Sequence, residues 1–201
     1  MKQLLMRLLV IAVLAIPVGA IAQEVACGQD QNKVAQTSMA KARDALLKTI
    51  AALKANDPLA VERAKLWLGI SDPTANSKLL ERLSKMFTAT EGITYRCSNQ
   101  STKKNHGLFA SILPSGKVAM LLGPSFWESG DGGFDSKAGV LIHEISHLSN
   151  AGGANTIPPY EEEIYGKELV LKLAKTLPIK AQNNAESIQL FVEAFYYGLT
   201  P

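Results

Sequence analysis

Apolar residues recur every three or four positions through much of the first hundred residues, which is the spacing of amphipathic helices. The pattern predicts a long helix over residues 28–56, with apolar positions at Val34, Leu46, Leu47, Ile50 and Leu53. A second helix is expected to begin at Pro58 with Asp57 as its N-cap, because proline suits the first helical position. A third is expected to bury Leu79, Leu80, Leu83, Met86 and Phe87.

The pattern then becomes one typical of strands. Residues 93–97 are rich in β-forming side chains, and the apolar runs 108–113 and 117–122 flank the turn sequence Pro114-Ser115-Gly116. These runs predict a hairpin. The free edge of a strand beside an active site can pair with an extended peptide, although an ordinary core hairpin has the same pattern.

The remaining elements are predicted to be helices joined by loops. Residues 123–127 and the glycine-rich residues 129–133 are expected to form a loop that enters a helix with Asp135 as its N-cap. Further helices are expected to end at Thr176 and to span about residues 184–197.

The helix after Asp135 contains the sequence His143-Glu144-Ile145-Ser146-His147, which holds two of the three histidines in the chain. Positions i and i+4 share one face of a helix, so both imidazoles can bind one metal ion while Ile142 and Ile145 face the core. Glu144 can act as general base towards a water at the metal. The alternative is a buried helix with two core histidines and a salt-bridged glutamate.

A catalytic zinc site needs a third protein ligand and leaves the fourth position for water. The acidic cluster Glu161-Glu162-Glu163 follows the motif and is the obvious supplier. At most one of the three is expected to bind metal, because a run of charges is usually solvated. The third histidine, His106, lies in a polar loop and is expected to be solvated.

The N-terminal segment predicts export. Two basic residues precede a short apolar run over residues 8–18, and Ala20-Ile21-Ala22 is a small-x-small cleavage site. The apolar run is shorter than a comfortable membrane span. We therefore expect a signal peptide over residues 1–22, a single domain over residues 23–201, and no stable membrane association after cleavage.

Charge and cysteine content narrow the partners and the compartment. The formal net charge is +3, and two of the positive charges lie in the expected signal peptide, so no nucleic acid or anionic membrane is indicated as a partner. Cys27 and Cys97 are the two cysteines, and an even number in an exported protein usually pairs. We expect a secreted or periplasmic monomer.

The order of these motifs resembles the deuterolysin and peptidyl-Lys metalloendopeptidase family, the aspzincins. The matching segments are Cys27 with the helices after it, Tyr95–Cys97, Gly123–Trp127, Asp135–Gly139, His143–His147, Tyr165-Gly166, and Asn184–Glu186 leading into Leu190-Phe191. They cover nearly all of the chain after the signal peptide. The resemblance implies an α+β, zincin-like fold that is mostly helical, with a small β-sheet, an active-site helix carrying the motif, and one Zn²⁺ as cofactor.

The resemblance also suggests roles for particular residues. In the family the third ligand is an aspartate three residues before a Tyr-Gly pair, which corresponds to Glu162 here, with Glu161 and Glu163 as competitors. The glutamate and a longer loop after His147 depart from the family pattern. Tyr165 matches a tyrosine whose phenol stabilises the oxyanion of the tetrahedral intermediate; its alternative role is packing at the start of a helix.

Lys-cleaving members of the family hold the substrate lysine with two acidic residues in the last helix. Those positions match Glu186 and Gln189, so one charge is kept and one becomes an amide, and a relaxed preference for Lys after the scissile bond is expected. Alternatively, Glu186 only stabilises the positive end of its helix dipole. A Cys27–Cys97 disulfide matches the bridge retained in the family.

These features together predict a zinc metalloendopeptidase acting on proteins or peptides. His143, His147 and Glu162 would hold the zinc, Glu144 would move the proton, and Tyr165 would assist. The altered third-ligand segment motivates an alternative, a catalytically inactive zinc-binding or interaction protein on the same scaffold. A hydrolase for another amide, such as one in the cell wall, is a further alternative.

Overall fold

A computed structural model describes residues 24–72, 77–98, 110–113, 119–155 and 162–201. The expected signal peptide, the hairpin turn at residues 114–116, His106 and Glu161 lie outside these ranges, so the expectations for them stay predictions.

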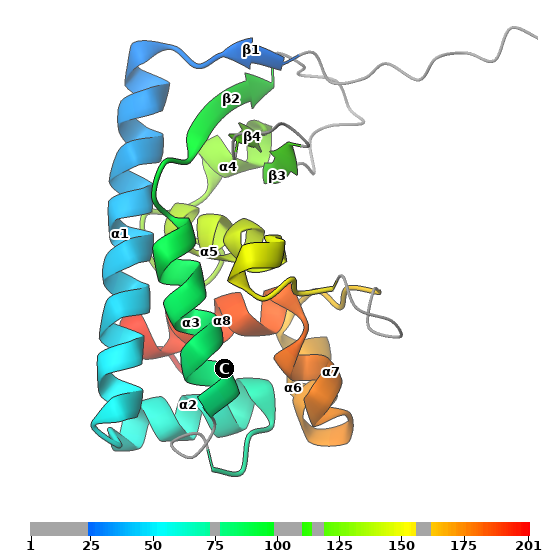
Figure 1. The fold of residues 1–201 in the computed structure, drawn as a ribbon. Coiled ribbons are helices and arrows are strands. Elements are labelled where there is room, and N and C mark those ends of the chain that lie inside the picture. Colours follow the sequence, from blue (N-terminus) through cyan, green and yellow to red (C-terminus); the bar gives the residue numbers. More distant parts are fainter. Residues whose placement is uncertain (1–23, 73–76, 99–109, 114–118, 156–161) are drawn as a thin grey trace, which may run out of the picture.

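The chain is mostly helical with one small sheet, as the α+β, zincin-like expectation requires. The helices are α1 Gln29–Lys54, α2 Pro58–Leu68, α3 Ser77–Ala89, α4 Pro124–Glu128, α5 Lys137–His147, the 3-10 turn η1 Ser149–Ala151, α6 Lys167–Thr176, α7 Pro178–Gln182 and α8 Ala185–Tyr196. The strands are β1 Glu24–Ala26, β2 Thr94–Ser98, β3 Ala110–Leu113 and β4 Ala119–Leu122. Figure 1 shows the sheet at one end of the long α1, α2 at the other end, and α5 between them.

The first helices form largely as their pattern predicts. Asp57 caps α2 by accepting hydrogen bonds from the backbone N–H groups of Leu59 at 2.9 Å and Ala60 at 3.0 Å. On α1 the large buried side chains include Leu46, Ile50 and Leu53, whereas Val34 and Leu47 are exposed, contrary to expectation. Each residue turns the helix by about 100°, so Leu47 lies about 200° around the helix from the buried Ala45, outside the buried face. Alanines complete that face instead: Ala35, Ala42 and Ala45.

The sheet has the strand order β1-β2-β4-β3. Strands β3 and β4 pair antiparallel, as the predicted hairpin requires, while β2 lies parallel to β4. The short β1 was not predicted, because three residues show no period; it pairs with β2 beside the Cys27–Cys97 disulfide. The expected disulfide is thus confirmed, and β3 lies at an edge of the sheet in contact with α5.

Two short helices differ from the expectation. Residues 124–128 form α4 where a loop was expected, and α7 begins directly at the break at Pro178. In both cases proline occupies the first helical position. Its fixed φ and missing N–H are tolerated there, so it begins a helix as readily as it ends one.

The start of α5 is fixed by α8 rather than by Asp135. The expected N-cap at Asp135 is wrong, because its φ of 56° is left-handed and Ser136 is the N-cap, accepting from Gly139 N at 3.0 Å. Glu193 on α8 accepts hydrogen bonds from Asp135 N at 3.1 Å, Ser136 N at 3.0 Å and Ser136 Oγ at 2.6 Å. Ile142 and Ile145 are buried on α5, as expected.

Gly139 allows α5 and α8 to approach this closely. A Cβ atom at Gly139 would lie 1.9 Å from Glu193 Oε1, a distance that no pair of atoms tolerates without movement. The carboxyl of Glu193 is almost fully buried. Burial raises its pKa to about 7, although hydrogen bonds from Ser136, Gln189 and the Asp135 backbone lower it.

Replacing Gly139 with alanine should destabilise the fold, because the added methyl group pushes Glu193 away from the first turn of α5. Overpacking of this kind costs about 1–3 kcal/mol, so Gly139→Ala should unfold at a clearly lower temperature in thermal denaturation. Gly132→Ala is the control, because Gly132 is exposed, lies outside the helices, and a Cβ atom there would come no nearer than 3.4 Å to the ring of Tyr197. Equal melting temperatures for the two variants would contradict this packing.

The raised pKa of Glu193 should make stability depend on pH. Between the ordinary value of 4.5 and about 7, the folded protein binds more protons at this group than the unfolded chain, so the contribution to stability falls as pH rises through that window. The loss is up to about 3 kcal/mol. In urea denaturation, the free energy of unfolding of Glu193→Gln should therefore rise relative to that of the wild type between pH 4.5 and pH 8. If the difference in unfolding free energy between the two proteins stayed constant over this pH range, the pKa of Glu193 would not be raised in the folded protein.

Candidate metal centre

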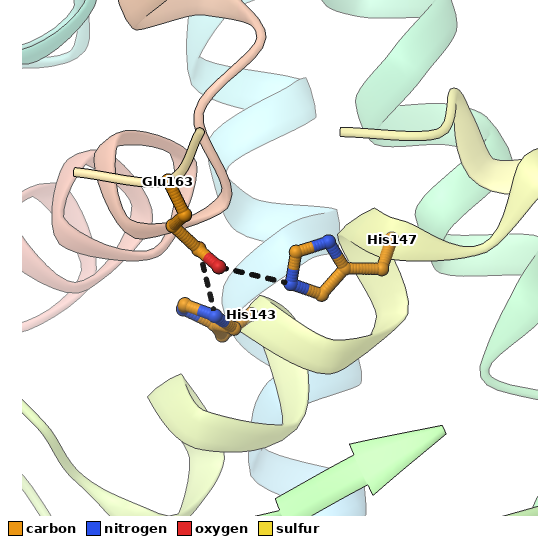
Figure 2. Close-up of side chains that lie close together, drawn as sticks. All are labelled: His143, His147 and Glu163. Atoms are coloured by element: carbon orange, nitrogen blue, oxygen red, sulfur yellow. Dashed lines mark ion pairs between the residues drawn. The ribbon is translucent and has the colours of Figure 1, made fainter. Parts of the chain in front are cut away.

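Two imidazoles and one carboxylate converge at the C-terminal half of α5. The rings of His143 and His147 lie one helical turn apart, with centroids 5.1 Å from each other. His143 Nε2 is 3.0 Å from Glu163 Oε1, and His147 Nε2 is 3.6 Å from Glu163 Oε2. Figure 2 shows both rings facing this carboxylate. The three candidate ligand atoms lie within 4.8 Å of one another.

Glu163, rather than the expected Glu162, brings its carboxylate to the histidines. The Glu163 side chain is 13% exposed, whereas that of Glu162 is 82% exposed and lies 3.5 Å from Lys180 Nζ. The segment is not helical, and the two neighbouring side chains have different partners, the histidines for Glu163 and Lys180 for Glu162. The acidic cluster indicated by the sequence therefore supplies the carboxylate near the histidines, but the count back from Tyr165 selected the adjacent glutamate.

The backbone of this segment is held by the first turn of α8. The fully buried Asn184 accepts from Ile164 N through Oδ1 and donates to Ile164 O through Nδ2, both at 2.9 Å. Glu186 Oε1 accepts from Gly166 N at 3.2 Å. Since Ile164 lies between Glu163 and Tyr165, these bonds fix where both side chains leave the backbone. In the sequence, Asn184 had no predicted role beyond its part in the family resemblance.

The second ring nitrogen of each histidine has its own partner. His147 Nδ1 lies 3.0 Å from the backbone oxygen of Ala154, in the loop after the motif. His143 Nδ1 lies 3.1 Å from Gln189 Oε1 and 3.4 Å from Glu186 Oε2. A carbonyl oxygen can only accept, so Nδ1 of His147 is a donor and Nε2 is the ring nitrogen that faces Glu163.

The surrounding carboxylates favour positive charge at His143. Burial lowers the pKa of this imidazole, but Glu163 and Glu186 outweigh burial and raise the pKa to about 10. Burial raises the pKa of Glu163, but its histidine neighbours outweigh this and hold it below its ordinary value. For Glu144 burial dominates, and its pKa is raised despite the two histidines. The same field that holds a proton at Nε2 would hold a metal cation there.

These residues fit a bound metal ion. Glu163 Oε1 is buried and accepts no hydrogen bond of acceptable geometry, although His143 Nε2 lies close. A buried carboxylate oxygen without a donor is costly, and a cation shared with the two Nε2 atoms would satisfy it. Two imidazole nitrogens and one carboxylate oxygen are a donor set typical of zinc. Within the described ranges this is the one such group of three residues.

Tyr165 lies at the rim of the centre. Its side chain is 59% exposed, its hydroxyl donates to Glu163 Oε2 at 2.6 Å, and its ring stacks on His143 with centroids 5.9 Å apart. Burial and the bond to Glu163 raise the pKa of the phenol above its ordinary value. This exposed position does not suit the alternative that Tyr165 is a packing residue.

The two expected substrate residues lie behind His143. Glu186 and Gln189 are both buried, and both contact the imidazole through Nδ1. Gln189 Nε2 lies 3.2 Å from Asp135 Oδ1 and 3.2 Å from Glu193 Oε2. The structure therefore brings both residues to the site, on the side of the imidazole opposite Glu163.

Comparison with known proteins shows what this arrangement is related to. An extracellular protease of Aeromonas hydrophila is 30% identical over 134 residues, which cover 66% of this chain and 36% of the relative. A peptidyl-Lys metalloendopeptidase of Pleurotus ostreatus is 30% identical over 132 residues, 65% of this chain and 73% of the relative. One from Grifola frondosa is 30% identical over 134 residues, 67% of this chain and 36% of the relative. The chain thus spans about a third of the length of two of these relatives.

The fold also has a solved counterpart. A zinc peptidase structure from Grifola frondosa superposes with a TM-score of 0.70 at 24% identity, covering 84% of this chain and 97% of that one. This similarity confirms the zincin-like fold. The model of the aspzincin M35 family, described as lysine-specific metallo-endopeptidase, matches residues 53–193, a span that includes α5, Glu163 and most of α8. This chain therefore belongs to the aspzincin M35 family.

Proposed function

We propose that this protein is a zinc metalloendopeptidase that hydrolyses proteins or peptides. The observation that carries the proposal is the convergence of His143 Nε2, His147 Nε2 and the Glu163 carboxylate beside Glu144. In this assignment Glu163 replaces Glu162 as the third ligand. The intact motif and the family of the chain favour catalysis over an inactive zinc-binding role.

Glu144 is suited to carry the proton. The chemistry that zinc supplies in such sites is activation of a water molecule and polarisation of a carbonyl group. Glu144 takes a proton from the attacking water while the water oxygen bonds to the carbonyl carbon of the substrate. It then gives that proton to the leaving nitrogen as the C–N bond breaks. Burial raises the pKa of Glu144, which helps a base that must next act as an acid.

Tyr165 and strand β3 are suited to hold the substrate. The phenol O–H of Tyr165 already points to the carboxylate at the site, and from this rim it can donate to an oxyanion developing on the substrate. Strand β3 lies at the sheet edge against α5. An extended peptide can pair with such an edge and lie across the histidines.

The substrate preference we propose is a relaxed one for Lys after the scissile bond. The fungal relatives are named peptidyl-Lys metalloendopeptidases. Of the two positions that match acidic residues in the Lys-cleaving members, only Glu186 carries a charge here. A lysine side chain near it would gain one ion pair rather than two.

The site of action we propose is the periplasm or the exterior of the cell, reached through a signal peptide over residues 1–22 that precedes one catalytic domain over residues 23–201. The Cys27–Cys97 disulfide suits an oxidising compartment. No helix in the described ranges is long and apolar enough to cross a bilayer. We propose that the mature protein acts as a monomer.

Glu144→Gln should abolish turnover without removing the metal, because the amide cannot accept the proton from water. Hydrolysis of casein or a Lys-containing peptide should fall about 10²- to 10⁴-fold, while zinc content measured by atomic absorption stays at one ion per chain. The exposed Glu128→Gln is the matched control. Retained hydrolysis in Glu144→Gln would refute the role of Glu144. A zinc-loaded wild type without turnover would favour the inactive alternative.

Glu163→Gln and Glu162→Gln distinguish the two candidate ligands, because each removes one charge from the same segment. Loss of a residue that only supports a ligand typically weakens metal binding about 10- to 100-fold, so Glu163→Gln should weaken zinc binding by at least about 100-fold. Glu162→Gln should bind zinc as the wild type does, measured by competition with a chromogenic chelator. If Glu162→Gln lost zinc affinity and Glu163→Gln kept it, Glu162 would be the third ligand.

A further inference from the structure

We propose that Gln189 is a positioning residue for the metal: its amide holds His143 with the proton on Nδ1, so that the Nε2 lone pair faces the metal position. This inference rests on the proposed function, because it takes His143 as a ligand. It concerns a residue that the sequence assigned to substrate binding.

The orientation of the Gln189 amide follows from its neighbours. Its nitrogen lies 3.2 Å from Asp135 Oδ1 and 3.2 Å from Glu193 Oε2. Carboxylate oxygens accept hydrogen bonds, and only the NH₂ end of an amide can donate. The two carboxylates therefore select the NH₂ end, and the carbonyl oxygen of Gln189 must face His143 Nδ1 at 3.1 Å.

This orientation sets the proton on His143. An amide oxygen can only accept, so Nδ1 must carry hydrogen, and Nε2 is the nitrogen that exchanges its proton for the metal ion. Glu186 Oε2, at 3.4 Å from the same nitrogen, favours the same arrangement. His147 is held in the same tautomer by a backbone oxygen at 3.0 Å. Both imidazoles thus present Nε2 to Glu163. His147 is held by the main chain at Ala154, and His143 is held by Gln189 on α8.

Water cannot easily replace this support. Gln189 is 3% exposed and Glu193 is 1% exposed. Glu193 is fixed in turn by the two N–H groups and the hydroxyl at the start of α5. Two buried side chains of α8, Glu193 and Gln189, therefore connect the start of α5 to His143. Removing Gln189 would leave Asp135, Glu193 and His143 without a shared hydrogen-bond partner.

The amide also suits this site better than the acid of the Lys-cleaving relatives. A glutamate at position 189 would bring a third carboxylate against the exposed Asp135 and the buried Glu193, and like charges at the buried end are costly. Both ends of the Gln189 amide are engaged within the protein. We conclude that Gln189 serves the metal centre rather than a substrate lysine.

Three variants test the proposal: Gln189→Leu removes the acceptor, Gln189→Glu keeps an acceptor, and Val192→Ala is a buried control on the same helix. Zinc affinity is measured by competition with a chromogenic chelator. Nitrogen-15 NMR of the zinc-loaded protein follows exchange of the His143 Nδ1–H with solvent. Kinetics on Lys-containing peptides give KM and kcat separately.

Gln189→Leu should bind zinc about 10- to 100-fold more weakly and should lose the slowly exchanging Nδ1–H signal. Gln189→Glu should bind zinc more tightly than Gln189→Leu and keep that signal, although its melting temperature should fall. Val192→Ala should lower the melting temperature while leaving zinc affinity within about twofold of the wild type, well short of the effect of a lost supporting residue.

Wild-type zinc affinity in Gln189→Leu would overturn the inference, most directly if KM for Lys-containing peptides rose at the same time. An equal loss of zinc affinity in Val192→Ala would also overturn it, because the effect would then come from α8 packing. If the wild type bound no zinc, both the proposed function and this inference would be wrong. The two outcomes named before would overturn only the inference on Gln189.

Discussion

The close packing of α8 against α5 is the constraint on which the metal centre depends. Gly139 leaves room for Glu193 to bind the first N–H groups of α5. An earlier turn of α8 carries Gln189, which reaches His143, and the N-cap of α8, Asn184, holds the backbone next to Glu163. One helix therefore sets the rotation of the imidazole and the path of the segment that supplies the carboxylate. Metal ligands held in this way are oriented towards the ion before it binds.

The electrostatics of the centre follow from the same packing. Three carboxylates, those of Glu144, Glu163 and Glu186, lie near His143 in a largely buried environment. Buried charges of one sign are unfavourable unless a cation is shared between them. The raised pKa of His143 shows how strongly the site favours positive charge when only a proton is available. A divalent cation at Nε2 meets the same demand and leaves Glu144 free to exchange its proton.

The sequence predicted the parts of the protein that depend on local spacing. The His143–His147 pair, the longer helices, the hairpin strands and the Cys27–Cys97 bridge follow from periodicity, motif spacing and an even number of cysteines. The choice of Glu163 over Glu162 could not be predicted in this way, because neighbouring glutamates look alike in sequence. The backbone between Glu163 and Tyr165 is positioned by hydrogen bonds from Asn184, about twenty residues later. The role of Gln189 was missed for the same reason, since its partners lie on other elements.

A crystal structure of the zinc-loaded protein, with anomalous scattering measured at the zinc absorption edge, tests the central claim most directly. We expect one strong anomalous peak bonded to the Nε2 atoms of His143 and His147 and to a carboxylate oxygen of Glu163. A peak bonded to Glu162 instead, imidazoles joined to the metal through Nδ1, or no peak near α5 would contradict the account.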